Sequence, residues 1–92
     1  MSKLPIKLGN LKGDTLNKQI LRIGIIAELD AINLYEQLSN TSDSEEVKKV
    51  LLDIAKEEKT HVGEFLTLLL KLDKEQEREL KEGKEEVEEI TK

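Results

Sequence analysis

Cysteine is absent from this chain of 92 residues, which excludes disulfides, thiolate zinc sites and iron–sulfur clusters. Tryptophan is absent as well, and Tyr35 and Phe65 are the only aromatic residues. A chain of this size buries only part of its apolar surface, so it needs a metal, disulfides or self-association to fold stably. Because disulfides are excluded, metal binding and self-association remain.

Positive charge is in deficit, because the formal net charge is −5 and residues 73–92 contain nine acids against five bases. We expect no nucleic-acid partner, since phosphate binding needs clustered Lys and Arg. We expect no membrane partner either, because apolar runs such as residues 66–70 are too short to span a bilayer. No signal-peptide pattern precedes the first predicted helix, and the composition predicts a soluble cytoplasmic protein.

Helical periodicity dominates the sequence and no strand pattern occurs, so the predicted fold class is all-α. Residues 1–13 carry three helix breakers and predict an irregular N-terminal arm, followed by a helical domain over residues 14–92. Asp14 or Thr15 is a plausible N-cap, after which apolar residues recur to about Leu38.

Two further helices follow a polar loop predicted at residues 39–44. Ser42 and Glu45 form a capping-box pattern for the second helix, which should run to about Leu72. Asp73 with Gln76 predicts another cap, for a short third helix that ends near residue 89 and is interrupted or weakened at Gly83. The first two helices should form an antiparallel hairpin.

The first helix is apolar over an unusually wide arc, so one partner helix cannot cover it. One apolar sector surrounds Glu28. The second sector, rotated by about a quarter turn, holds Leu16, Ile20, Ile23, Ala27, Leu34 and Leu38. The third helix carries a sparse stripe of Leu80, Val87 and Ile90, which we expect to contact a neighbouring subunit.

Glu28 and Glu58 each lie in the middle of an apolar helical stripe. Ten of the twelve positions three, four or seven residues away from them are hydrophobic, whereas Glu57 has two such neighbours of six and Glu64 has one. A carboxylate buried without a partner costs several kcal/mol or becomes neutral, and no Lys or Arg lies on these faces. The pattern therefore favours a bound cation.

His61 follows Glu58 by one helical turn and completes a Glu-x-x-His motif. At ~1.5 Å per residue, Glu28 and Glu58 lie ~18 and ~21 Å from the predicted turn, so they should face each other across the hairpin. Carboxylate and imidazole ligands suit iron or manganese, and zinc less well. These three donors are half of the set found in di-iron and di-manganese helical bundles, and a two-fold dimer would supply the other half.

The segments at residues 27–35 (AELDAINLY) and 57–61 (EEKTH) resemble those of encapsulated ferritin-like proteins. The resemblance spans roughly residues 14–90 and implies a half-ferritin that completes a four-helix bundle by dimerisation. It further implies a di-iron ferroxidase centre with two iron ions per dimer, with Mn or Zn as substitutes, and an annular decamer. The implied partner is an encapsulin shell protein, and the implied location is an encapsulin nanocompartment used for iron storage.

The same resemblance implies roles for individual residues. Glu28, Glu58 and His61 would be the metal ligands and catalytic residues, and Tyr35 would lie beside the centre. Asp30 would correspond to an acidic position on the path by which iron reaches it. Ala27 stands where some members have a second acid.

The sequence departs from the family pattern at a second position as well, and other functions remain open. Leu34 stands where some members of the family have Trp. The chain ends at Lys92 without an obvious apolar shell-targeting tail, which leaves both a domain of a shell fusion and a free half-ferritin open. A metal that merely staples the helices of a structural or cargo module is one alternative function. A rubrerythrin-like peroxide scavenger is another, although such enzymes usually carry a cysteine-ligated iron.

Overall fold

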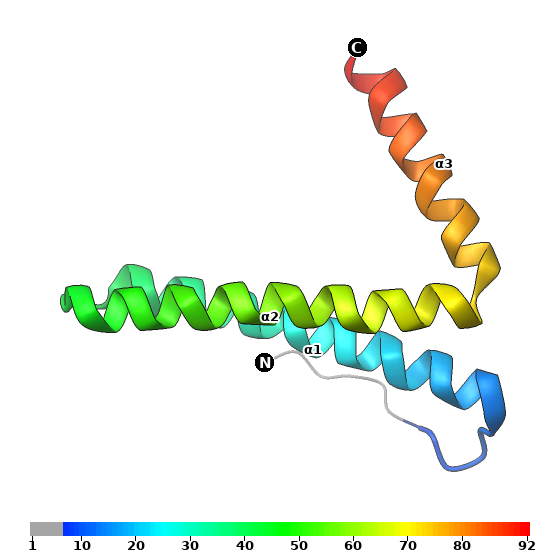
Figure 1. Cartoon of the computed structure of the whole chain (residues 1–92), viewed down its shortest axis with the longest axis horizontal. Helices are drawn as coiled ribbons and strands as arrows, with labels where there is room; N and C mark the ends of the chain where they lie inside the picture. The colour runs from blue at the N-terminus through cyan, green and yellow to red at the C-terminus, as the bar shows by residue number, and fades with distance from the viewer. Residues whose placement is uncertain (1–6) are drawn as a thin grey trace.

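The structure is a computed structural model that describes residues 7–92, and it consists of three helices in that range. Helix α1 spans Gly13–Thr41, α2 spans Glu45–Leu72 and α3 spans Lys74–Thr91. Helices α1 and α2 lie side by side as an antiparallel hairpin, and α3 leaves its end at a steep angle (Figure 1). The predicted all-α class, with a hairpin and a short C-terminal helix, is confirmed.

Helix α1 begins at Gly13, two or three residues earlier than a cap at Asp14 or Thr15 predicts, so neither residue is its N-cap. Lys12 is the N-cap and offers no side-chain hydrogen bond. Gly13 has a φ of +59°, a left-handed conformation that glycine adopts without strain, and it turns the chain into the helix. Asp14 lies in the first turn, where a negative charge interacts favourably with the helix dipole.

The connection between α1 and α2 is shorter than predicted, and the predicted capping box at Ser42 is wrong. Ser44 is the N-cap, and its hydroxyl accepts a hydrogen bond from the backbone N–H of Val47 at 3.3 Å. Ser42 instead ends α1, because its backbone N–H donates to the carbonyl of Leu38. Residues 39–41, expected in the loop, are helical. Ser39 is buried between the two helices, and its hydroxyl donates to the carbonyl of Lys48 on α2 at 3.2 Å.

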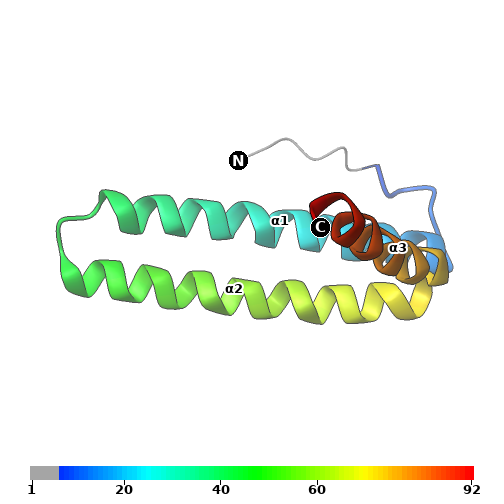
Figure 2. The same ribbon diagram turned by 90° about the horizontal axis from the view of Figure 1, so that it is seen from above.

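The apolar core of the described chain is small, and large hydrophobic side chains remain on the surface. Buried apolar residues are limited to Leu21, Ile32, Ala55 and Leu69. The dimensions of 45 × 44 × 21 Å reflect an open arrangement in which α3 stands clear of the hairpin (Figures 1 and 2). Such a core stabilises a single copy only marginally.

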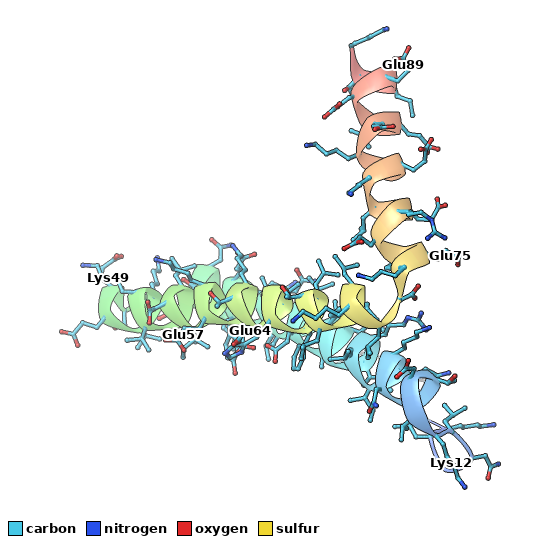
Figure 3. All side chains as sticks on the ribbon, turned by 45° about the vertical axis from the view of Figure 1, so that its right-hand side comes forward. Lys12, Lys49, Glu57, Glu64, Glu75 and Glu89 are labelled. Carbon is cyan, nitrogen blue, oxygen red and sulfur yellow. The ribbon has the colours of Figure 1, made fainter. Side chains whose placement is uncertain are left out.

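Helix α3 is continuous through Gly83, so a predicted interruption there is wrong, while the alternative of a weakened helix stays a prediction. Its side chains extend to both sides, clear of the hairpin (Figure 3). The predicted apolar stripe on α3 is exposed: 43% of Leu80 and 81% of Ile90 are accessible to solvent.

Asp73 separates α2 from α3 and makes a separate contact with each of its carboxylate oxygens. Oδ1 accepts the backbone N–H of Gln76 at 3.0 Å, which confirms the predicted cap, and Oδ2 accepts Nη2 of Arg22 on α1 at 2.8 Å. The Gln76 N–H lowers the pKa of Asp73 most, partial burial opposes it, and the Arg22 hydrogen bond and the charges of Lys18 and Arg22 lower it further.

We expect the start of α3 to loosen in acid. A carboxyl whose pKa is lower in the folded state contributes stability above its unfolded pKa of about 3.9, and that contribution is lost as the pH falls through the folded value. Asp73→Asn keeps a capping oxygen but cannot titrate, so its far-UV circular dichroism should change less than the parent's below pH 4. Asp73→Ala should lose α3 helicity already at pH 7. Equal acid transitions in the parent and Asp73→Asn would show that another group controls this end.

The predicted N-terminal arm is only partly described. Residues 7–12 are non-helical, and residues 1–6 of the arm lie outside the described residues. The division into an arm over 1–13 and a half-ferritin domain over 14–92 stays a prediction. None of the helices in residues 7–92 is long and apolar enough to cross a membrane.

Candidate metal centre

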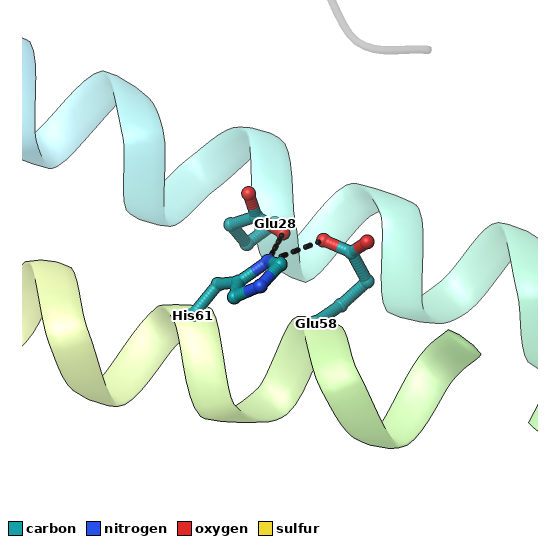
Figure 4. Close-up of side chains that lie close together, drawn as sticks. All are labelled: Glu28, Glu58 and His61. Atoms are coloured by element: carbon teal, nitrogen blue, oxygen red, sulfur yellow. Dashed lines mark ion pairs between the residues drawn. The ribbon is translucent and has the colours of Figure 1, made fainter. Parts of the chain in front are cut away.

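The hairpin brings Glu28, Glu58 and His61 together (Figure 4). The three residues lie near the middle of α1 and α2. Glu28 comes from α1, while Glu58 and His61 come from successive turns of α2. Antiparallel packing places Glu28 beside both residues, because Glu28 and Glu58 are separated from the turn by nearly equal numbers of residues. One ligand atom from each residue lies within 4.8 Å of the others, as the sequence predicts.

The imidazole lies between the two carboxylates without a hydrogen bond to either. Its Nδ1 is 3.5 Å from Oε2 of Glu28 and 3.4 Å from Oε2 of Glu58, beyond the usual hydrogen-bond range of about 2.7–3.2 Å. The side chains of Glu28 and Glu58 are 20% and 19% exposed, whereas that of His61 is 45% exposed. The two carboxylates of the cluster are therefore largely buried, and the imidazole faces solvent.

Oε2 of Glu28 is buried and has no hydrogen-bond partner. Within residues 7–92, no Lys or Arg forms an ion pair with Glu28 or Glu58; Lys59 pairs with Glu36 instead. Leaving a buried acceptor unsatisfied costs about 1–3 kcal/mol, and more for a charged group. A cation between the three side chains would remove this penalty.

The three donors fit a divalent cation in spacing and chemistry. Ligand atoms about 2.1 Å from one ion lie roughly 3–4 Å apart, depending on the angle between the bonds. The distances from Nδ1 of His61 to Glu58 and Glu28, 3.4 and 3.5 Å, fall in that range, and all three ligand atoms lie within 4.8 Å of one another. Two carboxylates and one imidazole suit iron or manganese and also accept zinc. Three protein ligands leave further coordination positions for a second copy, water or an oxidant.

The other residues singled out by the sequence are not part of the cluster. Tyr35 is half-buried on α1, two turns after Glu28. Asp30 is half-buried on the same helix and is not in the group of acids and histidine that the structure brings together. The roles predicted for Tyr35 and Asp30 stay predictions. Ala27 and Leu34, where the sequence departs from the family pattern, are exposed.

The sequence patterns did not predict two contacts between the helices. Arg22 of α1 pairs with Asp73 at the junction of α2 and α3. The ring of Phe65 packs against the backbone of Gly24 beside the cluster. The signal available was the helical register, since Gly24 precedes Glu28 by four residues and Phe65 follows His61 by four.

An antiparallel helical hairpin with one Glu on its first helix and Glu-x-x-His on its second defines the class, which is that of ferritin-like carboxylate proteins. Comparison with known proteins agrees. Residues 19–92 match the model of the family described as Rubrerythrin, and the chain belongs to that family.

The similar proteins confirm the resemblance to encapsulated ferritin-like proteins. The chain is 66% identical over 73 residues to a ferritin-like–encapsulin shell fusion protein of Pyrococcus furiosus, covering 79% of the chain and 21% of that protein. It is 40% identical over 78 residues to the encapsulin nanocompartment cargo protein EncC of Myxococcus xanthus, covering 85% of the chain and 60% of that protein. The chain thus spans about a fifth and three fifths of these relatives.

A solved structure matches the fold over nearly its full length. The crystal structure of an encapsulated ferritin domain from Pyrococcus furiosus superimposes with a TM-score of 0.86 at 55% sequence identity. The match covers 99% of this chain and 95% of that one.

Proposed function

We propose that this protein is a ferroxidase that oxidises Fe(II) to Fe(III) at a di-iron centre shared by two copies of the chain. The observation that carries the proposal is the group of Glu28, Glu58 and His61, in which a buried carboxylate oxygen has no hydrogen-bond partner. Membership of the rubrerythrin family and similarity to an encapsulated ferritin domain support iron as the substrate.

The electron balance of the reaction requires two iron ions acting together. Each Fe(II) gives up one electron, so two ions reduce one dioxygen, with two protons, to hydrogen peroxide, or one peroxide, with two protons, to two waters. The carboxylates of Glu28 and Glu58 favour the product, because anionic oxygen ligands bind the more highly charged Fe(III) more strongly. His61 supplies a neutral donor at the solvent-exposed side.

The shortage of ligands in one chain supports a dimer. Di-iron helical bundles use a Glu from each of two helices and Glu-x-x-His from each of the other two, whereas this hairpin supplies one of each. A two-fold axis through the site would bring the same three residues from the second copy and give six donors for two ions. Because both sets come from one sequence, the two half-sites would be equivalent.

The exposed apolar surface of α1 supports the same dimer. The predicted second sector is uncovered: Ile20, Leu34 and Leu38 are 46%, 43% and 45% exposed. Burying such side chains contributes roughly 25 cal/mol per Å² of apolar area removed from water. A second hairpin would thus cover apolar residues that α2 leaves exposed and close the open side of the metal cluster.

Anaerobic loading with Fe(II), followed by air, tests the proposal. We expect a ferric absorbance rise that continues through many iron ions per chain, at a metal-loaded mass equal to an even number of chains by analytical ultracentrifugation. Oxidation of one or two ions per chain followed by a halt would contradict the enzyme and favour a metal staple. A peroxide scavenger would instead use peroxide much faster than oxygen and need an external electron donor, since the chain has no cysteine.

The named relatives suggest where the protein works. Because they are an encapsulin shell fusion and an encapsulin cargo protein, we propose that this chain delivers Fe(III) into an encapsulin compartment in the cytoplasm, as a decameric ring built from dimers. Co-expression with an encapsulin shell protein should make the chain sediment with the shell. A chain that sediments alone would argue against this partner.

A further inference from the structure

Gly24 and Phe65 form a close contact beside the metal cluster. Gly24 lies on α1 one turn before Glu28, and Phe65 lies on α2 one turn after His61. A Cβ atom placed on Gly24 would be 3.1 Å from Cε2 and 3.2 Å from both Cδ2 and Cζ of the Phe65 ring. Two carbon atoms in favourable contact are about 3.5–4.0 Å apart, and these distances are shorter. The ring therefore occupies space that a side chain at position 24 would need.

The other glycines of the helices show that this contact is particular to Gly24. A Cβ placed on Gly63 of α2 or on Gly83 of α3 would meet nothing within 4 Å. At position 24, by contrast, the ring of Phe65 lies against the bare helix backbone.

His61 is the donor of the cluster that most needs an external constraint. Its side chain is the most exposed of the three, and its Nδ1 makes no hydrogen bond to either carboxylate. A histidine that binds metal usually has its ring held by a neighbouring group, and loss of such a group costs about 10–100-fold in metal affinity. Residues four apart on a helix lie on one face, which puts Phe65 on the His61 side of α2, in contact with α1.

We propose that Phe65, seated on the bare backbone of Gly24, is a positioning residue that fixes the spacing of α1 and α2 beside the metal cluster and so holds His61 opposite Glu28. This inference rests on the proposed metal-binding function of the three donors. Because position 24 has no side chain, the Phe65 ring can approach the backbone of α1 closely. A methyl group there pushes the ring away, displaces the preceding turn of α2, which carries His61, and misplaces the imidazole.

Binding of Co(II), measured by titration and by its visible absorption bands, tests this role without relying on catalysis. We expect Gly24→Ala to weaken Co(II) binding by at least about 10-fold and to alter the absorption bands that report coordination geometry. The matched control is Gly83→Ala, which makes the same chemical change in a helix but meets no neighbour, and it should bind Co(II) like the parent.

The Phe65→Leu background supplies the second arm, because the smaller side chain leaves room for a methyl group at position 24. There Gly24→Ala should cost less than about 3-fold, and this non-additivity would identify the ring as the mediator. An equal cost in both backgrounds would overturn the proposal. So would an affinity loss with unchanged absorption bands, which a loss of fold stability alone would produce.

Failure of the proposed function gives a different pattern. If the parent and Glu28→Ala bind Co(II) equally, the three donors are not the metal site, and both the proposed function and this inference fail. If the parent binds, Glu28→Ala does not, and Gly24→Ala matches the parent in affinity and spectrum, the metal site stands and the positioning role alone is wrong.

Discussion

Replacing Glu28 or His61 with alanine is expected to lower the initial rate of Fe(II) oxidation by more than about 100-fold. Loss of a group that merely supports a metal ligand costs about 10–100-fold, so loss of a ligand itself should cost more. The shared centre amplifies the effect, because one substitution removes two of six donors in a two-fold dimer. Stopped-flow absorbance of the ferric product after mixing anaerobic Fe(II)-loaded protein with oxygen measures the rate.

Glu57 and Glu64 provide matched controls for this loss. Both are exposed glutamates of α2, close in sequence to Glu58 and His61, and neither belongs to the cluster (Figure 3). Glu57→Ala and Glu64→Ala should oxidise Fe(II) at nearly the parental rate, because each removes the same negative charge without touching the three donors. Rates for Glu28→Ala and His61→Ala that match these controls would place catalysis elsewhere.

The position of the cluster could be predicted because it depends only on helical geometry. Glu28 and Glu58 lie at nearly equal rises from the turn, and His61 follows Glu58 by one turn. Helix α1 ends at Thr41 and α2 begins at Glu45, so Glu28 and Glu58 each lie 13 residues, or ~20 Å, from the turn, close to the ~18 and ~21 Å expected. The hairpin register therefore survived the wrong prediction of the loop at residues 39–44.

Helix ends were predicted less well because several serines compete for the same roles. Ser42 and Ser44 both precede glutamates, and the choice of Ser44 as the N-cap depends on where α1 stops. Helix α1 continues through Ser39, whose hydroxyl donates to the carbonyl of Lys48 across the hairpin, a tertiary contact that local patterns do not encode. Asp73 was predicted correctly as a cap, since its partner Gln76 lies only three residues away.

Two long-range contacts could not be derived from sequence patterns. The contact of Phe65 with Gly24 requires the distance between α1 and α2, which depends on all the side chains packed between them. The ion pair at the start of α3 requires Asp73 to meet Arg22, 51 residues earlier in the chain. Both are long-range contacts that arise only once the hairpin has formed.

Glu28→Leu is expected to stabilise the metal-free protein while abolishing its response to metal. Oε2 of Glu28 is buried without a hydrogen bond, which costs about 1–3 kcal/mol, and leucine places apolar atoms in the same apolar surroundings. For a domain of this size each kcal/mol corresponds to about 4–8 °C in melting temperature. The metal-free variant should therefore melt at least about 4 °C above the metal-free parent at the same protein concentration. Glu64→Leu, on an exposed position of α2, should gain little.

With metal bound, we expect the parent to melt at a higher temperature than Glu28→Leu. An ion that binds only the folded state adds about 2.7 kcal/mol at a concentration 100 times its dissociation constant. Mn(II) or Zn(II), neither of which oxidises under these conditions, should thus raise the melting temperature of the parent strongly and that of Glu28→Leu hardly at all. Chelation with EDTA should restore the metal-free order. A metal-free Glu28→Leu protein that melts below the parent would mean that this carboxylate already has a stabilising partner, and that the site is structural rather than built to hold a cation.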